Sequence, residues 1–399
     1  MIYIKKLFAD RLFWILDIMK RIDVIKKIGL GIFLLFSSKV FSEEKAGDKD
    51  AVLDKKEKND PVRFENREIK EPVLLCKEDG TLNWNAVGWS RKPLQIGNLS
   101  GSWPRKKKWN YWCITGKDYM FSITLTDLDY AGMIFAYYLN YETKEFIEDS
   151  ILLPFGAKLR MGQKVGDDAV YESEKCSVRM ISKEGFTELE VDWKDFKGKP
   201  LVSKIKVHYP KDQETLSVVV PWNNTQFQFT SKHHSLPSEG YFIHGEIKVN
   251  FQKEVTFGCL DFGRGIWPRK ISWNWGGVSG MSDNALVGLN LGAKWTDRTG
   301  ISENSICLNG KLEKIKEPLR FIYDTKNFMK PWQIQSTFSD KVDLIFTPFY
   351  ERIAVSDFFV IQSEVHQMFG RYTGRVRFGG KDYFLKNLIG WAEDHQAKW

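Results

Sequence analysis

Residues 103–111 read WPRKKKWNY, and residues 267–275 read WPRKISWNW. Six of the nine positions are identical at a single offset of 164 residues, and an aromatic residue closes each string. Self-similarity of this kind determines the architecture and has to be considered before any other signal. The two strings therefore predict a duplicated chain in which each copy opens with an equivalent segment.

A second repeat lies further along each copy. The segment 258–267 (GCLDFGRGIW) and the segment 390–399 (GWAEDHQAKW) share a glycine, an acid three residues later and a tryptophan six residues after the acid. The acids are Asp261 and Glu393. Each half of the chain thus opens with one signature and closes with the other, which is the order expected of a duplicated fold.

Between these signatures the sequence favours short antiparallel strands. Segments rich in β-branched and aromatic residues are bounded by turn residues; they include FSITLTDLDY (121–130), SKIKVHY (203–209), TLSVVVPW (215–222), TQFQFTS (225–231), VDLIFTPFY (342–350) and FFVIQSEVH (358–366). Long helical periodicity is nearly absent. We expect a mostly β protein with two tandem antiparallel barrel or sandwich halves, covering residues 61–265 and 266–399.

The N-terminal 60 residues differ in character from this body. Residues 1–42 are expected to be a signal peptide or an N-terminal anchor, because a basic stretch after Met19 precedes a short apolar run and a small residue at a cleavage position. Met19 is an alternative start. Residues 43–60 are charged and almost free of apolar side chains, which predicts a disordered linker. The protein is then periplasmic or secreted if the leader is cleaved, and membrane-anchored or cytoplasmic otherwise.

Composition excludes several classes of function. The net charge is +8, but the leader carries +5 of it, and no zinc-finger or aromatic ribonucleoprotein motif accompanies the basic cluster at 105–108, so we expect no nucleic-acid partner. Five cysteines are scattered without a C-x-x-C motif, which indicates neither a disulfide framework nor a zinc site. No nucleotide-binding or nucleophile-elbow motif is present in the sequence, so we expect no cofactor and no metal.

Several long strings resemble an uncharacterised bacterial family, the domain of unknown function 2804. The strings are AVGWSRKPL (86–94), RKKKWNYW (105–112), CLDFGRGIWPRKISWNWGG (259–277), GLNLGAKWTD (288–297), SEVHQMFGRYTG (363–374) and GWAEDHQAKW (390–399). The resemblance spans roughly residues 65–399 and implies a shared fold, but no activity.

The closing signature is also similar, more distantly, to that of AttH-like proteins, carotenoid hydratases and tocopherol cyclases. This resemblance implies two lipocalin-like barrels in tandem. The Asp-His pair that marks those proteins is present here as Asp394-His395, whereas the first half has Asp261 followed by Phe262. The first half therefore departs from the pattern.

The acids in repeated positions are the candidates for catalysis. A carboxyl group held among aromatic rings has its pKa raised by desolvation and can donate a proton at neutral pH. Glu393 with His395 is the preferred proton-transfer pair, and Asp261 is the second candidate. The structural alternative is that Asp261 pairs with Arg264 or Arg269 and fastens the junction of the two halves.

Other polar and aromatic side chains near the repeated strings are candidates for ligand binding. Glu364 and His366 stand two apart on a predicted strand and therefore share a face. The remaining candidates are Asn110, Asp129, Arg264, Trp273, Asn274, Lys294 and Trp295. For each of them a structural role in the core, in a turn or on a solvent-exposed face is the alternative.

The predicted function is the binding of a hydrophobic or amphiphilic small molecule, such as a lipid or isoprenoid, in a β-barrel cavity. One alternative is a cofactor-free acid–base enzyme of the hydratase or cyclase type that acts on such a molecule. A second alternative is carbohydrate binding on tryptophan faces. The N-terminus provides a further means of peripheral association with a membrane. A carboxylate that points into a cavity would favour the enzyme, and an open groove with exposed tryptophan would favour sugar binding.

Overall fold

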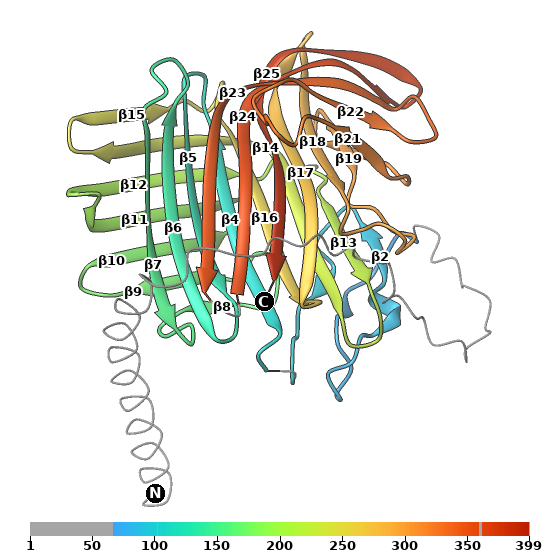
Figure 1. The fold of residues 1–399 in the computed structure, drawn as a ribbon, viewed down its shortest axis with the longest axis horizontal. Helices are drawn as coiled ribbons and strands as arrows, with labels where there is room; N and C mark the ends of the chain where they lie inside the picture. Colours follow the sequence, from blue (N-terminus) through green and yellow to red (C-terminus); the bar gives the residue numbers. More distant parts are fainter. Residues whose placement is uncertain (1–66, 102, 359–360, 399) are drawn as a thin grey trace, which may run out of the picture. The chain divides into compact units, whose positions relative to one another are not determined.

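The computed structural model describes residues 67–101, 103–358 and 361–398, so the predicted leader and linker lie outside the described residues. The described chain is built almost entirely from antiparallel strands (Figure 1), and its one helical element is the 3-10 turn η1 (Trp84–Ala86). In the ranges given above, no helix is long and apolar enough to cross a membrane. The predicted mostly β fold with two antiparallel halves is confirmed.

The first large sheet has 14 strands. They are β2 (Gly88–Ser90), β4 (Lys106–Thr115), β5 (Tyr119–Asp127), β6 (Ala131–Asn140), β7 (Phe146–Pro154), β8 (Arg160–Met161), β9 (Ala169–Glu172), β10 (Cys176–Lys183), β11 (Phe186–Phe196), β12 (Lys199–His208), β13 (Leu216–Pro221), β14 (Phe227–His244), β15 (Ile247–Phe251) and β16 (Phe257–Ile266). A separate two-stranded sheet pairs β1 (Val73–Leu74) with β3 (Gln95–Ile96).

The second large sheet has nine strands in the order β20-β19-β18-β17-β25-β24-β23-β22-β21. They are β17 (Lys270–Ser282), β18 (Ala285–Ala293), β19 (Ser305–Leu308), β20 (Lys311–Lys314), β21 (Leu319–Ile322), β22 (Trp332–Ser336), β23 (Val342–Phe358), β24 (Ile361–Phe378) and β25 (Lys381–Lys398). The chain passes from one large sheet to the other between β16 and β17. Below, the first half means the strands of the first large sheet and the second half those of the second.

The strand register confirms the duplication. Asp261 on β16 lies opposite Tyr111 on β4, and Glu393 on β25 lies opposite Trp275 on β17. Tyr111 and Trp275 are separated by the same 164 residues as the opening strings, so both repeats hold equivalent places in their sheets. On the next strand of each sheet, β14 and β24 supply the neighbours of these two acids.

Strand β14 lets the first sheet change direction. Its first part pairs with β16 and β13, and its second part pairs with β12 and β15. The register shifts between His233 and Leu236, and Ser235 at this bulge has a φ of 59°. A bulge bends a strand and increases its twist. In Figure 1 the strands β9–β12 and β15 accordingly run across the direction of β4–β7.

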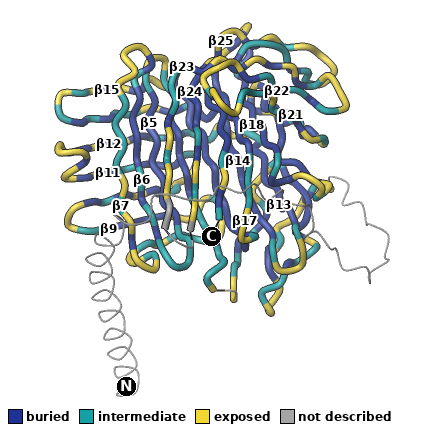
Figure 2. The backbone as a smooth tube through the Cα atoms, in the orientation of Figure 1, coloured by how far each residue is buried: buried dark blue, intermediate teal, exposed yellow. Residues whose placement is uncertain are grey.

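The apolar side chains form three clusters. One fills the first half, a second fills the second half, and a third joins Tyr111 and Tyr137 of the first half to Trp275, Phe369 and Trp391 of the second. Every residue of β16 is buried: Leu260 and Phe262 belong to the first-half core, and Cys259 on the other face belongs to the cluster that joins the halves. Figure 2 shows that buried residues run through the middle of the strands, whereas exposed residues lie mainly in the loops. All five cysteines are buried and unpaired, as small apolar residues would be.

Candidate functional site

Asp261 lies in a buried polar network between the two halves. Its Oδ2 is 2.8 Å from Nζ of Lys232 on β14, and its Oδ1 accepts a hydrogen bond of 3.0 Å from the Thr230 hydroxyl. The same Lys232 Nζ is 3.3 Å from Glu303 of the second half and 4.4 Å from the ring centroid of Trp275. One buried cation is thus shared by two carboxylates and an indole face, and it connects the halves.

The structural alternative in which Asp261 pairs with Arg264 is wrong. The two residues are three apart on one strand, so their side chains point to opposite faces. Arg264 is buried on the other face, where its guanidinium donates to Gly162 O at 2.8 Å and to Asn110 Oδ1 at 3.0 Å. It also donates to Trp109 O at 3.0 Å. Arg264 therefore fastens a loop and the start of β4 to β16.

Glu393 occupies the position in the second half that Asp261 occupies in the first. Its Oε1 accepts a 2.8 Å hydrogen bond from Trp273 Nε1, and its Oε2 accepts one of 3.1 Å from Gln367 Nε2. Burial raises the pKa of Glu393 to about 7, although the Trp273 hydrogen bond and the charge of Lys232 act in the opposite direction. Gln367 stands where the first half has Lys232, so within the described ranges no cation is bonded directly to this acid.

His395 shares the inter-sheet face with Glu393 but contacts a different set of atoms. Its ring lies 3.8 Å from the Trp273 ring, centroid to centroid, and its Nε2 is 2.8 Å from Ser363 Oγ. Burial lowers the pKa of His395 to about 3, so the imidazole is neutral at physiological pH. The Trp273 indole contacts both members of the predicted pair, and it is the indole that bonds to the carboxylate.

A second polar cluster lies on the other face of β25, around Asp394. Asp394 Oδ2 accepts hydrogen bonds from Lys294 Nζ, from the Tyr323 hydroxyl and, at 3.3 Å, from Asn274 Nδ2. Burial favours a higher pKa for Asp394, but the bonds from Lys294 and Tyr323 outweigh it and lower the pKa. Lys294 has a φ of 72°, a backbone conformation that is uncommon outside glycine. The structure brings together the predicted residues Asn274 and Lys294 here.

Glu364 and His366 share a face, as predicted. His366 Nε2 is 3.0 Å from Glu364 Oε1, and its Nδ1 is 2.7 Å from Glu351 Oε1, while its ring stacks on Phe328 at 4.2 Å. Burial acts to lower the pKa of His366, but the two carboxylates raise it above its ordinary value. This imidazole is held on both nitrogens by acids.

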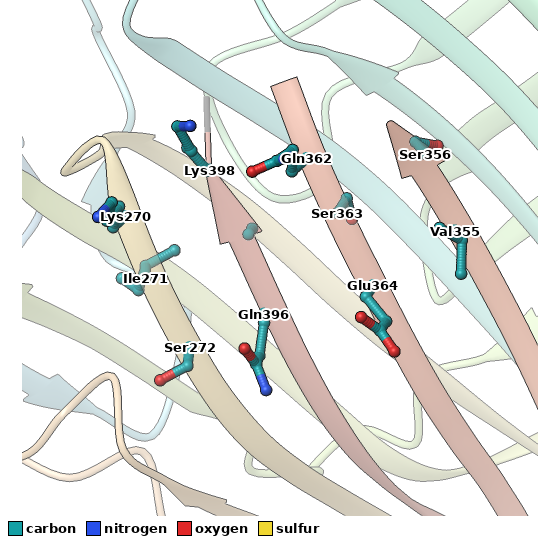
Figure 3. A pocket seen from close by; sticks show the side chains of 11 residues that line it. Lys270, Ile271, Ser272, Val355, Ser356, Gln362, Ser363, Glu364, Gln396 and Lys398 are labelled. Carbon is teal, nitrogen blue, oxygen red and sulfur yellow. The ribbon is translucent and has the colours of Figure 1, made fainter. Parts of the chain in front are cut away.

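Beside Glu364, the ends of four strands surround an open pocket of about 560 Å³ (Figure 3). Ser272, Gln396 and Glu364 lie side by side across β17, β25 and β24 and face the same way. Other side chains at this pocket include Lys270, Gln362 and Lys398. Among the described residues, the lining is mostly polar and contains no aromatic side chain.

A more apolar cavity of about 440 Å³ lies within the first half. Its buried lining includes the apolar side chains of Trp112, Met180, Leu260 and Phe262, and exposed lysines stand at Lys92, Lys183 and Lys211. Asn110 is the one predicted site residue that lines it. No sequence signal had singled out the others, because β4, β10, β14 and β16 bring them together from distant parts of the chain.

Polar groups in this cavity form a hydrogen-bonded chain. The Tyr209 hydroxyl is 2.8 Å from His233 Nδ1, and His233 Nε2 is 2.9 Å from Ser231 Oγ. Ser231 Oγ in turn is 2.7 Å from Ser217 Oγ. The adjacent His234 turns to the opposite face, as strand geometry requires, and stacks on Trp391.

The two remaining predicted residues have structural partners. Trp295 is buried, packs edge-on against Trp222 and donates its Nε1 hydrogen to Glu303 Oε1. Asp129 lies in the turn after β5 with a φ of 78°, and its Oδ1 is 3.3 Å from Lys106 Nζ. Within the ranges that the structure describes, no three His, Cys, Asp or Glu side chains are grouped so that they could hold a metal ion.

Residues 66–399 match the family described as domain of unknown function (DUF2804), and the chain belongs to this family, as its sequence predicted. No curated protein matches the chain.

Solved structures with a similar fold share little sequence with this chain. Kievitone hydratase from Nectria haematococca is 12% identical, with a TM-score of 0.43, over 74% of this chain and 89% of that one. CghA is 10% identical, with a TM-score of 0.49, over 84% and 96% of the two chains. A candidate AttH from Nitrosomonas europaea is 12% identical, with a TM-score of 0.39, over 76% and 98%.

Proposed function

We propose that this protein binds an amphiphilic small molecule in the cavity of the first half, with the apolar body of the ligand inside and an acidic end group at the mouth. The observation that carries the proposal is the cavity itself. Its volume of about 440 Å³ suits a small-molecule ligand, and half of its buried lining residues are apolar, namely Trp112, Met180, Leu260 and Phe262. Lys92 and Lys211 are exposed at this cavity, whereas Lys183 is paired with Glu188 at 2.8 Å. The acid among the lining residues, Asp167, already accepts two backbone hydrogen bonds.

The positions of the predicted catalytic acids support binding rather than acid–base chemistry. Asp261 and Glu393 line neither cavity; they face the junction of the halves and are bonded to Lys232 and to Trp273. The described lining of the polar pocket in Figure 3 contains no aromatic side chain on which a sugar ring could stack, so it gives carbohydrate binding no direct support.

The test is calorimetric titration with dodecanoate, a simple acid with an apolar chain. The double variant Lys92→Glu/Lys211→Glu should bind dodecanoate about tenfold more weakly, because two attractive charges become repulsive. It should bind neutral dodecanol as the wild type does. Reversal of two exposed lysines outside the cavity, Lys194→Glu/Lys253→Glu, is the matched control. Met180→Trp, which fills the cavity, should weaken both ligands.

Two results would contradict the proposal. One is a wild-type protein to which dodecanoate does not bind. The other is unchanged affinity for dodecanoate in both the cavity-filling variant and the charge-reversed variant, which would place the bound ligand elsewhere on the protein.

A further inference from the structure

We propose that the cavity of the first half also recognises an uncharged oxygen, a hydroxyl or carbonyl group, on the apolar body of its ligand, and that Tyr209 and Thr215 are the residues that bind it. The inference rests on the proposed function and names the ligand class more closely. A molecule that satisfies both parts is a hydroxy or keto acid with an apolar chain.

The first observation is a hydroxyl group without a partner. Thr215 lines the cavity and is 5% exposed, and its Oγ1 is buried and makes no hydrogen bond with any part of the chain that the structure describes. A buried hydroxyl that forms no hydrogen bond costs free energy. A ligand oxygen in the cavity would supply the missing partner.

The second observation is the position of this threonine. Leu216 pairs with Lys232 across β13 and β14, so Thr215, one residue before Leu216, stands beside His233, one residue after Lys232. Side chains at neighbouring positions on one face of such a pair lie close together. The free hydroxyl of Thr215 and the hydrogen-bonded pair of Tyr209 and His233 thus belong to one polar patch of the cavity wall.

The third observation is that the hydrogen-bonded pair of Tyr209 and His233 can act toward a ligand either as a donor or as an acceptor. Burial lowers the pKa of His233 to about 3, so the imidazole carries one N–H. The Tyr209 hydroxyl also interacts with the Thr187 side chain. If the imidazole hydrogen is on Nε2, Tyr209 donates to Nδ1, and its oxygen accepts from Thr187 and from a ligand donor. If the hydrogen is on Nδ1, it donates to the Tyr209 oxygen, and the phenol hydrogen can turn from Thr187 to a ligand carbonyl.

The environment selects an uncharged group at this position. The cavity's exposed lysines stand at its mouth, whereas His233 is 1% exposed and neutral, so an ionised carboxylate beside it would lose its hydration without gaining a cation. A hydroxyl or carbonyl oxygen carries a far smaller desolvation cost. The acid end therefore remains at the lysines, and the uncharged oxygen reaches Tyr209 and Thr215.

The experiment compares dodecanoate with a series of dodecanoic acids that carry one hydroxyl or keto group at successive carbons, each titrated calorimetrically. At least one isomer should bind the wild type about fivefold to tenfold more tightly than dodecanoate, the gain expected of one satisfied hydrogen bond. Thr215→Val and Tyr209→Phe should each reduce this preference to about twofold or less. The affinity of each variant for dodecanoate is the reference from which its preference is calculated.

Matched controls are Thr347→Val and Tyr383→Phe, which lie in the second half and should keep the full preference. Thr215→Val should melt no lower than the wild type, because its hydroxyl has no bond to lose. If dodecanoate binds but no isomer is preferred, or if both cavity variants retain the preference, the inference is overturned while the proposed function stands. If dodecanoate does not bind at all, both fail.

Discussion

Replacement of Glu393 by glutamine should change how the stability of the protein depends on pH. The folded-state pKa of Glu393 is about 7, raised by burial from 4.5, so folding favours the protonated acid. The stabilisation that protonated Glu393 gives the folded state is fully present below pH 4.5 and is lost as the pH rises through 7. At 1.36 kcal/mol for each unit of pKa, the loss amounts to about 3 kcal/mol between pH 4.5 and 8.

Glutamine cannot ionise, so this part of the pH dependence should disappear in Glu393→Gln. The charges of Lys232, Arg352 and Asp261 act on Glu393 and are present in both proteins, so their own contributions cancel in the comparison. We expect the free energy of unfolding of the variant, relative to wild type, to rise by about 3 kcal/mol from pH 4.5 to 8.

Urea unfolding at several pH values measures this difference, with the exposed Glu142→Gln as the control. If the free energy of unfolding changes with pH in parallel for Glu393→Gln and the wild type, the reasoning is refuted. Such a result would mean that the buried carboxyl ionises in the folded protein as easily as in the unfolded chain.

Three further outcomes are expected. Lys232→Met should lower the free energy of unfolding by about 3–5 kcal/mol in urea melts, because it leaves two buried carboxylates without their shared cation. A Cβ atom at Gly263 would lie 2.1 Å from the Trp109 ring, and Gly263→Ala should lower the thermal midpoint at a cost of about 1–3 kcal/mol. The five buried thiols should resist iodoacetamide in the folded protein at neutral pH and react in urea, as intact mass shows; rapid alkylation of the native protein would contradict their burial.

Repetition within the sequence made the architecture predictable. The opening strings start equivalent strands, and the closing acids Asp261 and Glu393 lie opposite Tyr111 and Trp275 in the same register. The limits of the strands were harder to predict from the sequence. The string 225–231 predicted a short strand, but β14 continues to His244 through a proline and a glycine, because a bulge absorbs the change in direction.

The contacts of the candidate site could not be predicted, because they depend on register between distant strands. Lys232 reaches Asp261 only because β14 and β16 pair in one alignment, which places these two residues opposite each other. In the sequence Arg264 is closer to Asp261 than Lys232 is, but the alternation of side chains along β16 points Arg264 to the opposite face. Tyr209 and His233 meet across a bend whose position no local motif marks. Spacing along the sequence predicted side-chain contacts only between residues of one strand, as for Glu364 and His366.

The residues that repeat between the two halves lie where the halves contact each other. The same face of each sheet enters the junction: Tyr111 of the first half and its equivalent Trp275 of the second pack edge-on against each other, with ring centroids 5.7 Å apart. This is the self-complementary pattern of an isologous dimer, formed here within one chain.

A ligand site that serves one half has no reason to be repeated. The register places Met368, a buried core residue, where the first half has His233, so the hydrogen-bonded chain of the cavity belongs to the first half alone. Thr215 and Tyr209 likewise lie outside both repeated signatures. In a duplicated fold whose halves face each other, the residues that repeat are therefore the strongest guide to assembly, and binding residues are better sought where the halves differ.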